Sequence, residues 1–442
     1  MPSPQRSASF FPDTTSSYER SVLANGARVL TSRMMHTNAV SVVFLVGAGS
    51  RYETDDEAGV SHLFEHMLFK GTPSRPRPRD ISGVVESVGG TINAFTDREC
   101  TGYWCRMALP HYRRGVEVIA DIIKSPLFRE ADIAQEKHVV LEEIRATMDS
   151  PGALAGLLLD SALWPEQPLG RDIAGSIETV EAIPRSVMID YHREQYVGRN
   201  IVVSVAGNVE HDEVVEQLDG LLSDLPDGEP RSMFSYQDNL SGPSITGDRR
   251  DLEQLHIAMA FKGVGMQDPR RAALRIMTVV LGGSMSSRLF EEVREKRGLA
   301  YGIGSSMHTL TDCGVLDIHT GVDSSRSVEA LQVIVHELAK MREGITEDEL
   351  HDARELAKGR MILGMEESRA VANDLAAQEL LRGEIESLES RINDLDAVSL
   401  QDVRFVAEEV LTPDKLAMSV VGPADEWTEM EKSLTFDTVA KV

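Results

Sequence analysis

The chain of 442 residues is longer than the roughly 150 residues of an average domain, so two or three domains are expected. Its composition, 42% hydrophobic and 26% charged, is typical of a globular protein, and no apolar run approaches the roughly 18 residues of a membrane span, which excludes an integral membrane protein. The 45 basic residues against 71 acidic ones give a net charge of −26, which excludes general nucleic-acid binding and favours basic partners such as cationic peptides.

The first residues, 1–20, are rich in serine and proline and lack the order of a secretory signal, so we expect a flexible tail. A mitochondrial presequence is less favoured because Arg6 and Arg20 are accompanied by Asp13 and Glu19. The three cysteines are too few for a disulfide framework or a cysteine-rich zinc cage. They favour a reducing compartment, with the bacterial cytoplasm expected before the mitochondrial matrix.

A first domain is predicted over residues 21–221. It opens with Asn25-Gly26 between two short apolar runs, which is typical of a hairpin turn. Apolar runs at 39–47 and 200–207 predict buried strands, and one or two further strands are expected within 91–109. Apolar residues at helical spacing predict helices over 59–70, 81–88, 114–125 and 130–148.

Residues 222–250, rich in Asp, Gly, Pro and Ser, are the predicted linker to a second domain at 251–442. The pattern of elements then begins again, with strands expected at 256–261, 300–306, 314–321 and 415–422 and helices at 271–281, 285–296, 327–341 and 347–361.

The two halves indicate a diverged duplication. The hexapeptide SRLFEE at 287–292 is similar to SHLFEH at 61–66. We expect an α+β fold of two similar α/β domains, each an antiparallel-rich sheet covered by helices. The alternative is chance similarity between two unrelated α/β domains.

The clearest chemical signal is His62-Leu-Phe-Glu65-His66. Positions i and i+4 share one face of a helix, so both imidazoles can bind one metal ion. Glu65 points close to the same side, where it can act on a metal-bound water. This is the H-x-x-E-H order, and two imidazoles with one carboxylate suit zinc. The alternative is a solvated helix that carries these residues by chance.

A third ligand should be acidic and come from elsewhere. The predicted helix 130–148 offers Glu136, Glu142 and Glu143. Glu136 and Glu143 lie about two turns apart and share a face, which neighbouring apolar residues mark as partly buried. Buried carboxylates require a partner, which zinc or its histidine ligands would supply. Glu142 is better explained as a solvated surface residue.

Residues 62–72, HLFEHMLFKGT, resemble the signature of the pitrilysin-type zinc peptidases. The branch they resemble most contains mitochondrial processing peptidase and its small bacterial relatives. The resemblance extends over nearly the whole chain. It implies that zinc is held by His62, His66 and Glu143, with Glu136 supporting the ligands and Glu65 acting as the general base.

The second half also resembles the family. Residues 281–301 are similar to its distal active-site segment, which implies that Arg294 and Tyr301 reach the catalytic cleft and stabilise the oxyanion. Without the resemblance, Arg294 would be a surface charge and Tyr301 an ordinary strand aromatic. The second half carries no equivalent zinc ligands, since Arg288 stands opposite His62 in the local alignment.

The family binds its substrate as an added strand, and residues 89–96 match the segment that does so. Asn93 would hydrogen-bond the peptide, while Ala94 and Phe95 contribute main chain. The two preceding glycines would let another backbone approach closely. An ordinary interior strand is the alternative.

These observations predict a zinc-dependent endopeptidase, with one Zn²⁺ per chain, that cleaves extended peptides or small unfolded polypeptides inside a chamber formed by dimerisation. A homodimer would suffice because the chain carries both motifs. The alternatives are an active subunit paired with an inactive paralogue, or a non-catalytic structural or substrate-binding subunit. No nucleic-acid or membrane partner is expected.

Overall fold

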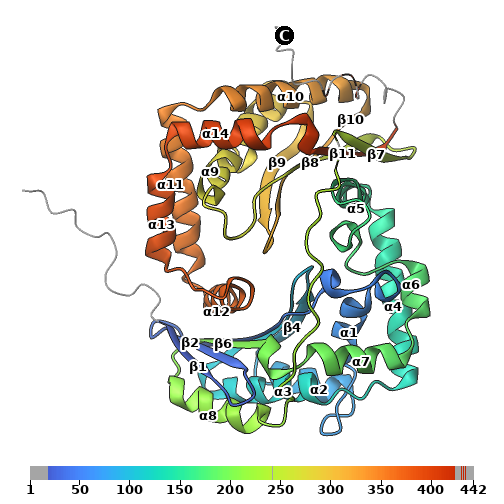
Figure 1. Ribbon diagram of the computed structural model, residues 1–442, viewed down its shortest axis with the longest axis vertical. Helices are drawn as coiled ribbons and strands as arrows, with labels where there is room; N and C mark the ends of the chain where they lie inside the picture. Colours follow the sequence, from blue (N-terminus) through green and yellow to red (C-terminus); the bar gives the residue numbers. More distant parts are fainter. Residues whose placement is uncertain (1–17, 241, 424–429, 431, 433, 435–442) are drawn as a thin grey trace, which may run out of the picture.

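The computed structural model describes residues 18–240 and 242–423, together with 430, 432 and 434. Two β-sheets with their helices form two halves, which lie one above the other in Figure 1. Positions 1–17 of the expected tail lie outside the described residues. Residues 18–20 of the expected tail belong instead to the first strand, Tyr18–Val22. Among the described residues, no helix combines the length and apolar character needed to cross a bilayer.

The first sheet is mostly antiparallel, and its order is β1-β2-β6-β3-β5-β4, with β2 and β6 parallel. The predicted hairpin is confirmed, since Gly26 has a φ of +84° in the turn between β1 and β2. The predicted strands at 39–47 and 200–207 are also confirmed. The strands are β1 (Tyr18–Val22), β2 (Arg28–Arg33), β3 (Ala39–Val46), β4 (Thr91–Thr96), β5 (Thr101–Ala108) and β6 (Ile201–Gly207).

Most helices of the first half cover one face of this sheet, and four of them were predicted from apolar spacing. The first-half helices are α1 (Val60–Leu68), α2 (Pro78–Glu86), α3 (Tyr112–Lys124), α4 (Glu130–Asp149), α5 (Pro151–Leu163), α6 (Ile177–Ala182), α7 (Arg185–Gln195) and α8 (His211–Leu222). Leu63, Phe64 and Met67 of α1 are fully buried in the core that these helices share with the sheet. Their burial leaves the opposite side of α1 for polar residues.

The second sheet has the order β7-β11-β8-β10-β9, with β7 and β11 parallel. The expected helix at 285–296 begins only at Arg288, because Ser284–Ser287 form a turn that Ser287 Oγ closes on the Ser284 carbonyl at 2.6 Å, and its later part, Phe290–Glu295, is π-helical. The other elements are β7 (Ser244–Arg249), β8 (Gln254–Lys262), β9 (Ala300–Thr309), β10 (Gly314–Asp323), β11 (Leu416–Gly422), α9 (Arg271–Gly282), α10 (Ser327–Glu343), α11 (Glu347–Gly364), α12 (Ser368–Ala377), α13 (Leu388–Ala397) and α14 (Leu400–Val410).

The sheet orders confirm two similar domains, because β2-β6-β3-β5-β4 correspond one by one to β7-β11-β8-β10-β9. The local alignment of SHLFEH with SRLFEE is wrong, however. By position between equivalent strands, α1 corresponds to α9, and α2 corresponds to the segment Phe290–Glu295. The conclusion drawn from that alignment still holds, since α9 contains neither histidine nor acidic residues.

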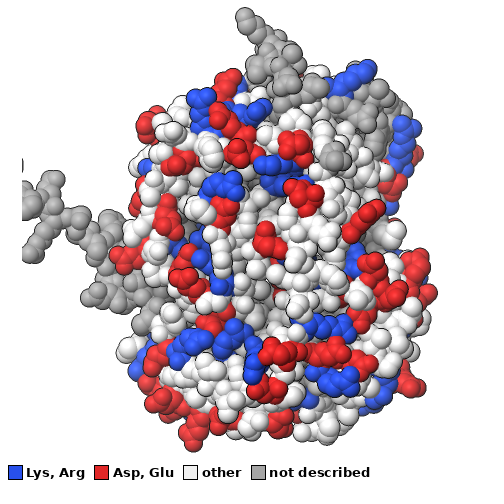
Figure 2. All heavy atoms as spheres, viewed as in Figure 1, with Lys and Arg blue, Asp and Glu red and all other residues white. Residues whose placement is uncertain are grey.

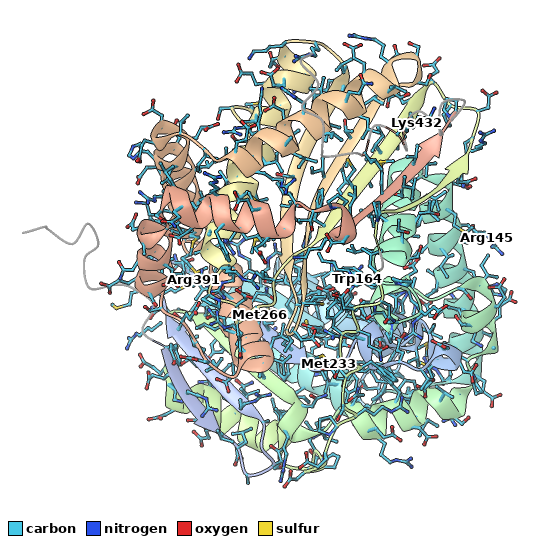
Figure 3. All side chains as sticks on the ribbon, turned by 45° about the horizontal axis from the view of Figure 1, so that its top comes forward. Arg145, Trp164, Met233, Met266, Arg391 and Lys432 are labelled. Atoms are coloured by element: carbon cyan, nitrogen blue, oxygen red, sulfur yellow. The ribbon has the colours of Figure 1, made fainter. Side chains whose placement is uncertain are left out.

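Each half contributes one helix to the other half's sheet. Helix α5, from the first half, packs on β8 and β11, and α12, from the second half, packs on β3 and β6. The first contact buries Leu159 against Ala260, and the second buries Leu375 in a cluster with Val43. Trp164, directly after α5, lies at this junction between the halves (Figure 3). Each half therefore needs a helix from the other half to cover one face of its sheet.

The expected linker at 222–250 is partly wrong, because Ser244–Arg249 form β7 of the second sheet. The remaining stretch is held to both halves. Arg231 pairs with Glu57 at 2.6 Å in the first half, and Asp238 pairs with Lys262 in the second. These ion pairs fix the segment against both domains.

A buried arginine adds a direct connection between the halves. Arg51, fully buried in the first half, pairs with Glu99 at 2.6 Å and with Asp312 of the second half at 2.6 Å. On the surface, acidic and basic side chains are interspersed on the face seen in Figure 2 rather than gathered by sign.

Candidate metal centre

The helix that carries the two histidines is held at its N-terminus by backbone conformation and by a buried carboxylate. Gly59 has a φ of +92°, and a Cβ there would lie 2.4 Å from the Ala174 carbonyl oxygen. Glu53, 1% exposed, accepts hydrogen bonds from the backbone N–H groups of Gly59 at 2.9 Å and Ser61 at 2.8 Å. Burial raises the pKa of Glu53, although these two bonds oppose the shift. Glu53 thus fixes the start of α1.

The three predicted zinc ligands lie together. The Nε2 atoms of His62 and His66 are 3.8 and 3.6 Å from Oε2 of Glu143. One ligand atom from each residue lies within 4.8 Å of the other two, and this is the only such group among the described residues. His62 and His66 come from α1, and Glu143 comes from the neighbouring α4.

The electrostatics of these residues fit a metal ion. Burial, followed by the charge of His66, lowers the pKa of His62 to about 4, so its imidazole is neutral at physiological pH and free to donate a lone pair. Two neutral imidazoles and a carboxylate are a donor set that zinc prefers. The carboxylate of Glu143 is 48% exposed, which leaves one side of the group open to water or substrate. The residues present therefore fit zinc.

Glu136, two turns before Glu143 on α4, supports one of the histidines from behind. Its Oε2 lies 3.3 Å from Nδ1 of His66, and its Oε1 lies 2.5 Å from Nζ of Lys70. Glu142 is 73% exposed and pairs with Arg145, as a solvated residue would. The three acids of α4 thus occupy three different environments.

Glu65 lies beside the group without belonging to it. Thr96 Oγ1, at the end of β4, donates a hydrogen bond to its Oε2 at 2.9 Å. Burial, with the charge of Glu143 adding to it, raises the pKa of Glu65, while the bond from Thr96 and the charge of His66 act in the opposite direction. A carboxylate with a raised pKa can take up a proton and return it near neutral pH.

The predicted substrate strand is an edge strand, which excludes the interior-strand alternative. β4 pairs only with β5 among the described strands, and Asn93, Ala94 and Phe95 lie on it. Asn93 Oδ1 accepts from the N–H of Ala94 at 2.8 Å, so this side chain is engaged locally. The glycines have a different role from the one expected. Gly89, with a φ of +79°, turns the chain after α2, and a Cβ on Gly90 would lie 3.0 Å from the Arg106 carbonyl oxygen.

Arg294 and Tyr301 lie together in the second half. The guanidinium of Arg294 stacks 5.2 Å from the ring centroid of Tyr301 and 4.6 Å from that of Phe290. Tyr301 is 85% exposed, at the start of the edge strand β9. Within the described part of the chain, no hydrogen bond or ion pair connects either residue to the zinc ligands or to Glu65. Their catalytic role stays a prediction.

Three residues at this site were not anticipated from the sequence: Glu53, Lys70 and Thr96. An acid shortly before a helix start is a common signal, which could have indicated Glu53. Lys70 lies eight residues after His62, about two turns along α1 and its extension, so helical spacing could have placed it on the same side. Nothing in the sequence indicates which residue of β4 faces Glu65.

Comparison with known proteins agrees with this geometry. Residues 28–176 match the family described as "Insulinase (Peptidase family M16)", and residues 182–356 match "Peptidase M16 inactive domain". An uncharacterized zinc protease of Mycobacterium leprae is 34% identical over 410 residues, 91% of each chain. One of Bacillus subtilis is 32% identical over 407 residues, 92% of this chain and 98% of the relative.

The fold has solved counterparts as well. The crystal structure of a protease from Helicobacter pylori matches with a TM-score of 0.86 at 22% identity, over 92% of this chain and 100% of that one. At that identity the likeness shows the fold alone. The matches to both halves, and relatives at 34% identity over 91% of the chain, identify this protein as a member of peptidase family M16, the pitrilysin-type peptidases.

Proposed function

We propose that the protein is a zinc-dependent endopeptidase. The observation that supports this most directly is the convergence of His62, His66 and Glu143, whose ligand atoms lie within 4.8 Å of one another, with Glu65 beside them. A non-catalytic subunit would not need two imidazoles and a carboxylate brought this close together beside a further carboxylate, Glu65. The proposal includes one zinc per chain.

Bound zinc would supply a water of lowered pKa and polarise the scissile carbonyl. Glu65 takes the proton of the attacking water and then passes it to the leaving amine, which its raised pKa favours. The hydrogen bond from Thr96 holds one Glu65 oxygen in place, so the other oxygen remains available for proton transfer. Glu136 keeps the His66 ring oriented through Nδ1.

The substrate would bind as an extended strand along β4. An edge strand offers unpaired N–H and C=O groups to a peptide. β4 ends at Thr96, whose side chain contacts Glu65, so a peptide paired with this strand would run past the general base. This arrangement suits internal segments of a chain, and it supports an endopeptidase that acts on extended or unfolded peptides.

Arg294 and Tyr301 would serve the metal centre of a second copy. Within one chain Tyr301 is exposed, Arg294 is half-buried against it, and neither forms a hydrogen bond or ion pair with the described zinc ligands, so the pair is placed to enter a partner's site. A homodimer would then contain two complete sites inside one chamber. In a heterodimer with an inactive paralogue, that paralogue would have to supply an equivalent pair. The three free cysteines are buried, which agrees with a reducing compartment such as the cytoplasm.

The experiment that tests this function measures zinc and peptidase activity together. The purified chain should contain about one zinc and cleave quenched fluorescent peptides. The His62→Ala/His66→Ala double variant should lose both. A chelator should abolish cleavage, and added zinc should restore it. Full zinc content in the double variant would refute the ligand assignment, and a zinc-loaded protein without any peptidase activity would refute the function.

A further inference from the structure

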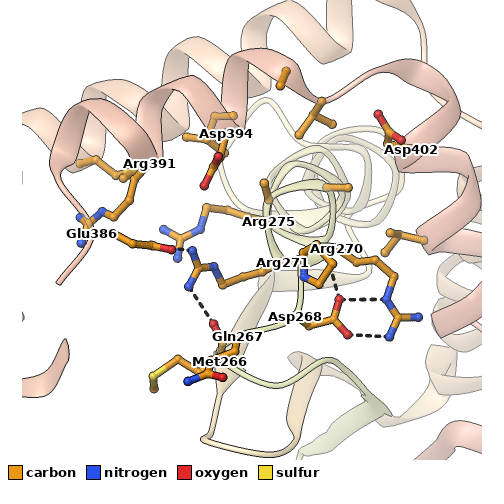
Figure 4. A pocket seen from close by; sticks show the side chains of 18 of the residues that line it. Met266, Gln267, Asp268, Arg270, Arg271, Arg275, Glu386, Arg391, Asp394 and Asp402 are labelled. Atoms are coloured by element: carbon orange, nitrogen blue, oxygen red, sulfur yellow. Dashed lines mark hydrogen bonds and ion pairs between the residues drawn. The ribbon is translucent and has the colours of Figure 1, made fainter. Parts of the chain in front are cut away.

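The second half contains a cavity of about 800 Å³. It lies between the N-terminal part of α9 and residues of α11, α12, α13 and α14 (Figure 4). Helices α9 and α11 are the counterparts of α1 and α4, which carry the zinc ligands in the first half. The volume is that of a small-molecule site. The helix pair thus carries the predicted zinc ligands in the first half, whereas its counterpart borders a cavity in the second half.

Arginines from several elements line the cavity, and four of them are already paired with acids. Arg271 bonds to Glu386 at 2.8 Å, and Arg391 bonds to Asp374 at 2.8 Å. The other pairs are Arg270 with Asp268 at 2.7 Å and Arg382 with Glu386 at 2.5 Å. Glu386 pairs with two of them, and each of the four guanidinium groups contacts a carboxylate that the protein itself supplies.

Arg275 is different. Its side chain extends from α9 into the cavity (Figure 4), and no residue in the described part of the chain forms a hydrogen bond or ion pair with it. Burial, and then the charges of Arg391 and Arg271, lower the pKa of Arg275, while the charge of Asp374 acts in the opposite direction. A guanidinium that keeps its charge in such surroundings gains from a bound anion.

The rest of the cavity wall is largely apolar. Met266 precedes α9, and Met266 and Arg391 both lie beside the helices of the second half in Figure 3. Phe405 of α14 also lines the cavity and is 51% exposed, although phenylalanine is normally buried. The lining thus holds five arginines and five acidic residues, and Arg275 is the arginine that no carboxylate of the described residues contacts, next to surface that an apolar group could cover. Asp394 and Asp402 also line it, and they disfavour a ligand with two negative charges.

We propose that this cavity binds a carboxylate with one negative charge and an apolar body, such as the C-terminal residue of a peptide or a free hydrophobic amino acid. Arg275 pairs with the carboxylate through charge-assisted hydrogen bonds, and the apolar wall around Phe405 receives the side chain. The site does not need the metal centre and does not depend on the proposed peptidase activity. In a peptidase, however, it would bind a C-terminal carboxylate, which is a group that each cleavage creates.

Calorimetric titration of the full-length, zinc-loaded protein tests this site. N-acetyl-leucine is the probe for a peptide C-terminus, leucine is the probe for a free amino acid, and N-acetyl-leucinamide lacks the carboxylate. We expect N-acetyl-leucine to bind at least about tenfold more tightly than N-acetyl-leucinamide. Arg275→Ala should remove this preference, while Arg404→Ala, which deletes an exposed arginine of α14 outside the cavity, should leave it unchanged.

Two further variants keep the test decisive. Ala272→Phe, on the cavity side of α9, should block binding by filling the space even if Arg275→Ala folds poorly. The His62→Ala/His66→Ala variant should bind the probe normally. Equal binding of acid and amide, or unchanged binding in the Ala272→Phe protein, would overturn the proposal. Loss of binding in the His62→Ala/His66→Ala protein would also overturn it, because the carboxylate would then be on the metal.

The two carboxylate probes distinguish the source of the ligand. If leucine binds as tightly as N-acetyl-leucine, the site accepts free amino acids. If it binds more weakly, the site prefers peptide ends.

Discussion

Nδ1 of His66 lies 3.3 Å from Oε2 of Glu136, a carboxylate that is only 3% exposed. The other nitrogen of the ring faces Glu143, so one imidazole connects a buried acid to the metal centre. This arrangement fixes which ring nitrogen is available for zinc, because an Nδ1–H that donates to Glu136 leaves the lone pair on Nε2.

The first prediction follows from that contact. Glu136→Gln should weaken zinc binding by about 10- to 100-fold, because the ring loses its charged acceptor and Lys70 loses its partner. Chelator competition measures the dissociation constant. Glu142→Gln, on the same helix but 73% exposed, is the matched control and should bind zinc as the wild type does. Equal affinity in both variants would contradict the supporting role of Glu136.

The second prediction separates the base from the ligand. Glu65→Gln keeps the size and the bond from Thr96 but removes the proton acceptor, so zinc should remain while turnover falls by roughly 100-fold or more. Glu143→Gln should instead lower the zinc content. Metal analysis and peptide cleavage on the same samples measure both effects. The opposite pattern would mean that the two glutamates exchange roles.

A third prediction tests whether Arg294 and Tyr301 act in a second copy. Tyr301→Phe should reduce cleavage by about 10²–10³-fold with zinc unchanged. When Glu65→Gln and Tyr301→Phe chains are co-expressed, half of the dimers are mixed, and each mixed dimer has one intact site. Activity should therefore recover to about a quarter of the wild-type value. If the pair served its own chain, the mixture would stay inactive.

The fourth prediction concerns acid pH. Hydrogen bonding from Arg382, assisted by Arg271, lowers the pKa of Glu386 to about 2. The folded pKa lies below the unfolded one, so this stabilisation is complete above about pH 4.5 and disappears as the pH falls toward 2. Urea unfolding should show Glu386→Gln less stable than wild type by about 1 kcal/mol at pH 7, after allowance for solvent screening, with a smaller difference at pH 3. Asp414→Asn, an exposed change, should show no such trend.

The fifth prediction comes from the helices that the halves exchange. A fragment of residues 1–222 lacks α12, so the sheet face around Val43 and Leu45 is uncovered. It should aggregate or unfold without a cooperative transition, whereas co-expression with residues 223–442 should give a soluble complex. Gel filtration and urea unfolding are the measurements. A soluble, cooperatively folded 1–222 monomer would show that α12 is dispensable.

Much of the metal site could be predicted from the sequence because it depends on local spacing. His62 and His66 are one helical turn apart, and a helix places them together whatever surrounds it. The choice of Glu143 needed the family resemblance, since spacing alone left Glu136 and Glu143 equivalent. Thr96 could not be assigned because its contact with Glu65 depends on how β4 packs against α1.

The exchange of α5 and α12 is beyond sequence reasoning for a related reason. Leu154, Leu159 and Leu163 show that α5 has an apolar face, but an apolar face does not specify which sheet it covers. The local similarity of SHLFEH and SRLFEE misled the alignment of the halves, because six matching positions carry less information than the order of strands around them.

The position of α12 late in the chain also affects how the protein folds during translation. The last strand of the first sheet, β6, is complete at Gly207, but α12, which covers the face of this sheet turned toward the second half, ends at Ala377. A ribosome adds those 170 or so residues in roughly 10–30 s. During that interval Val43, Leu45 and Val202 form an apolar surface on the nascent chain. The first half therefore waits for the second before it can finish folding, and chaperones have that long to act on it.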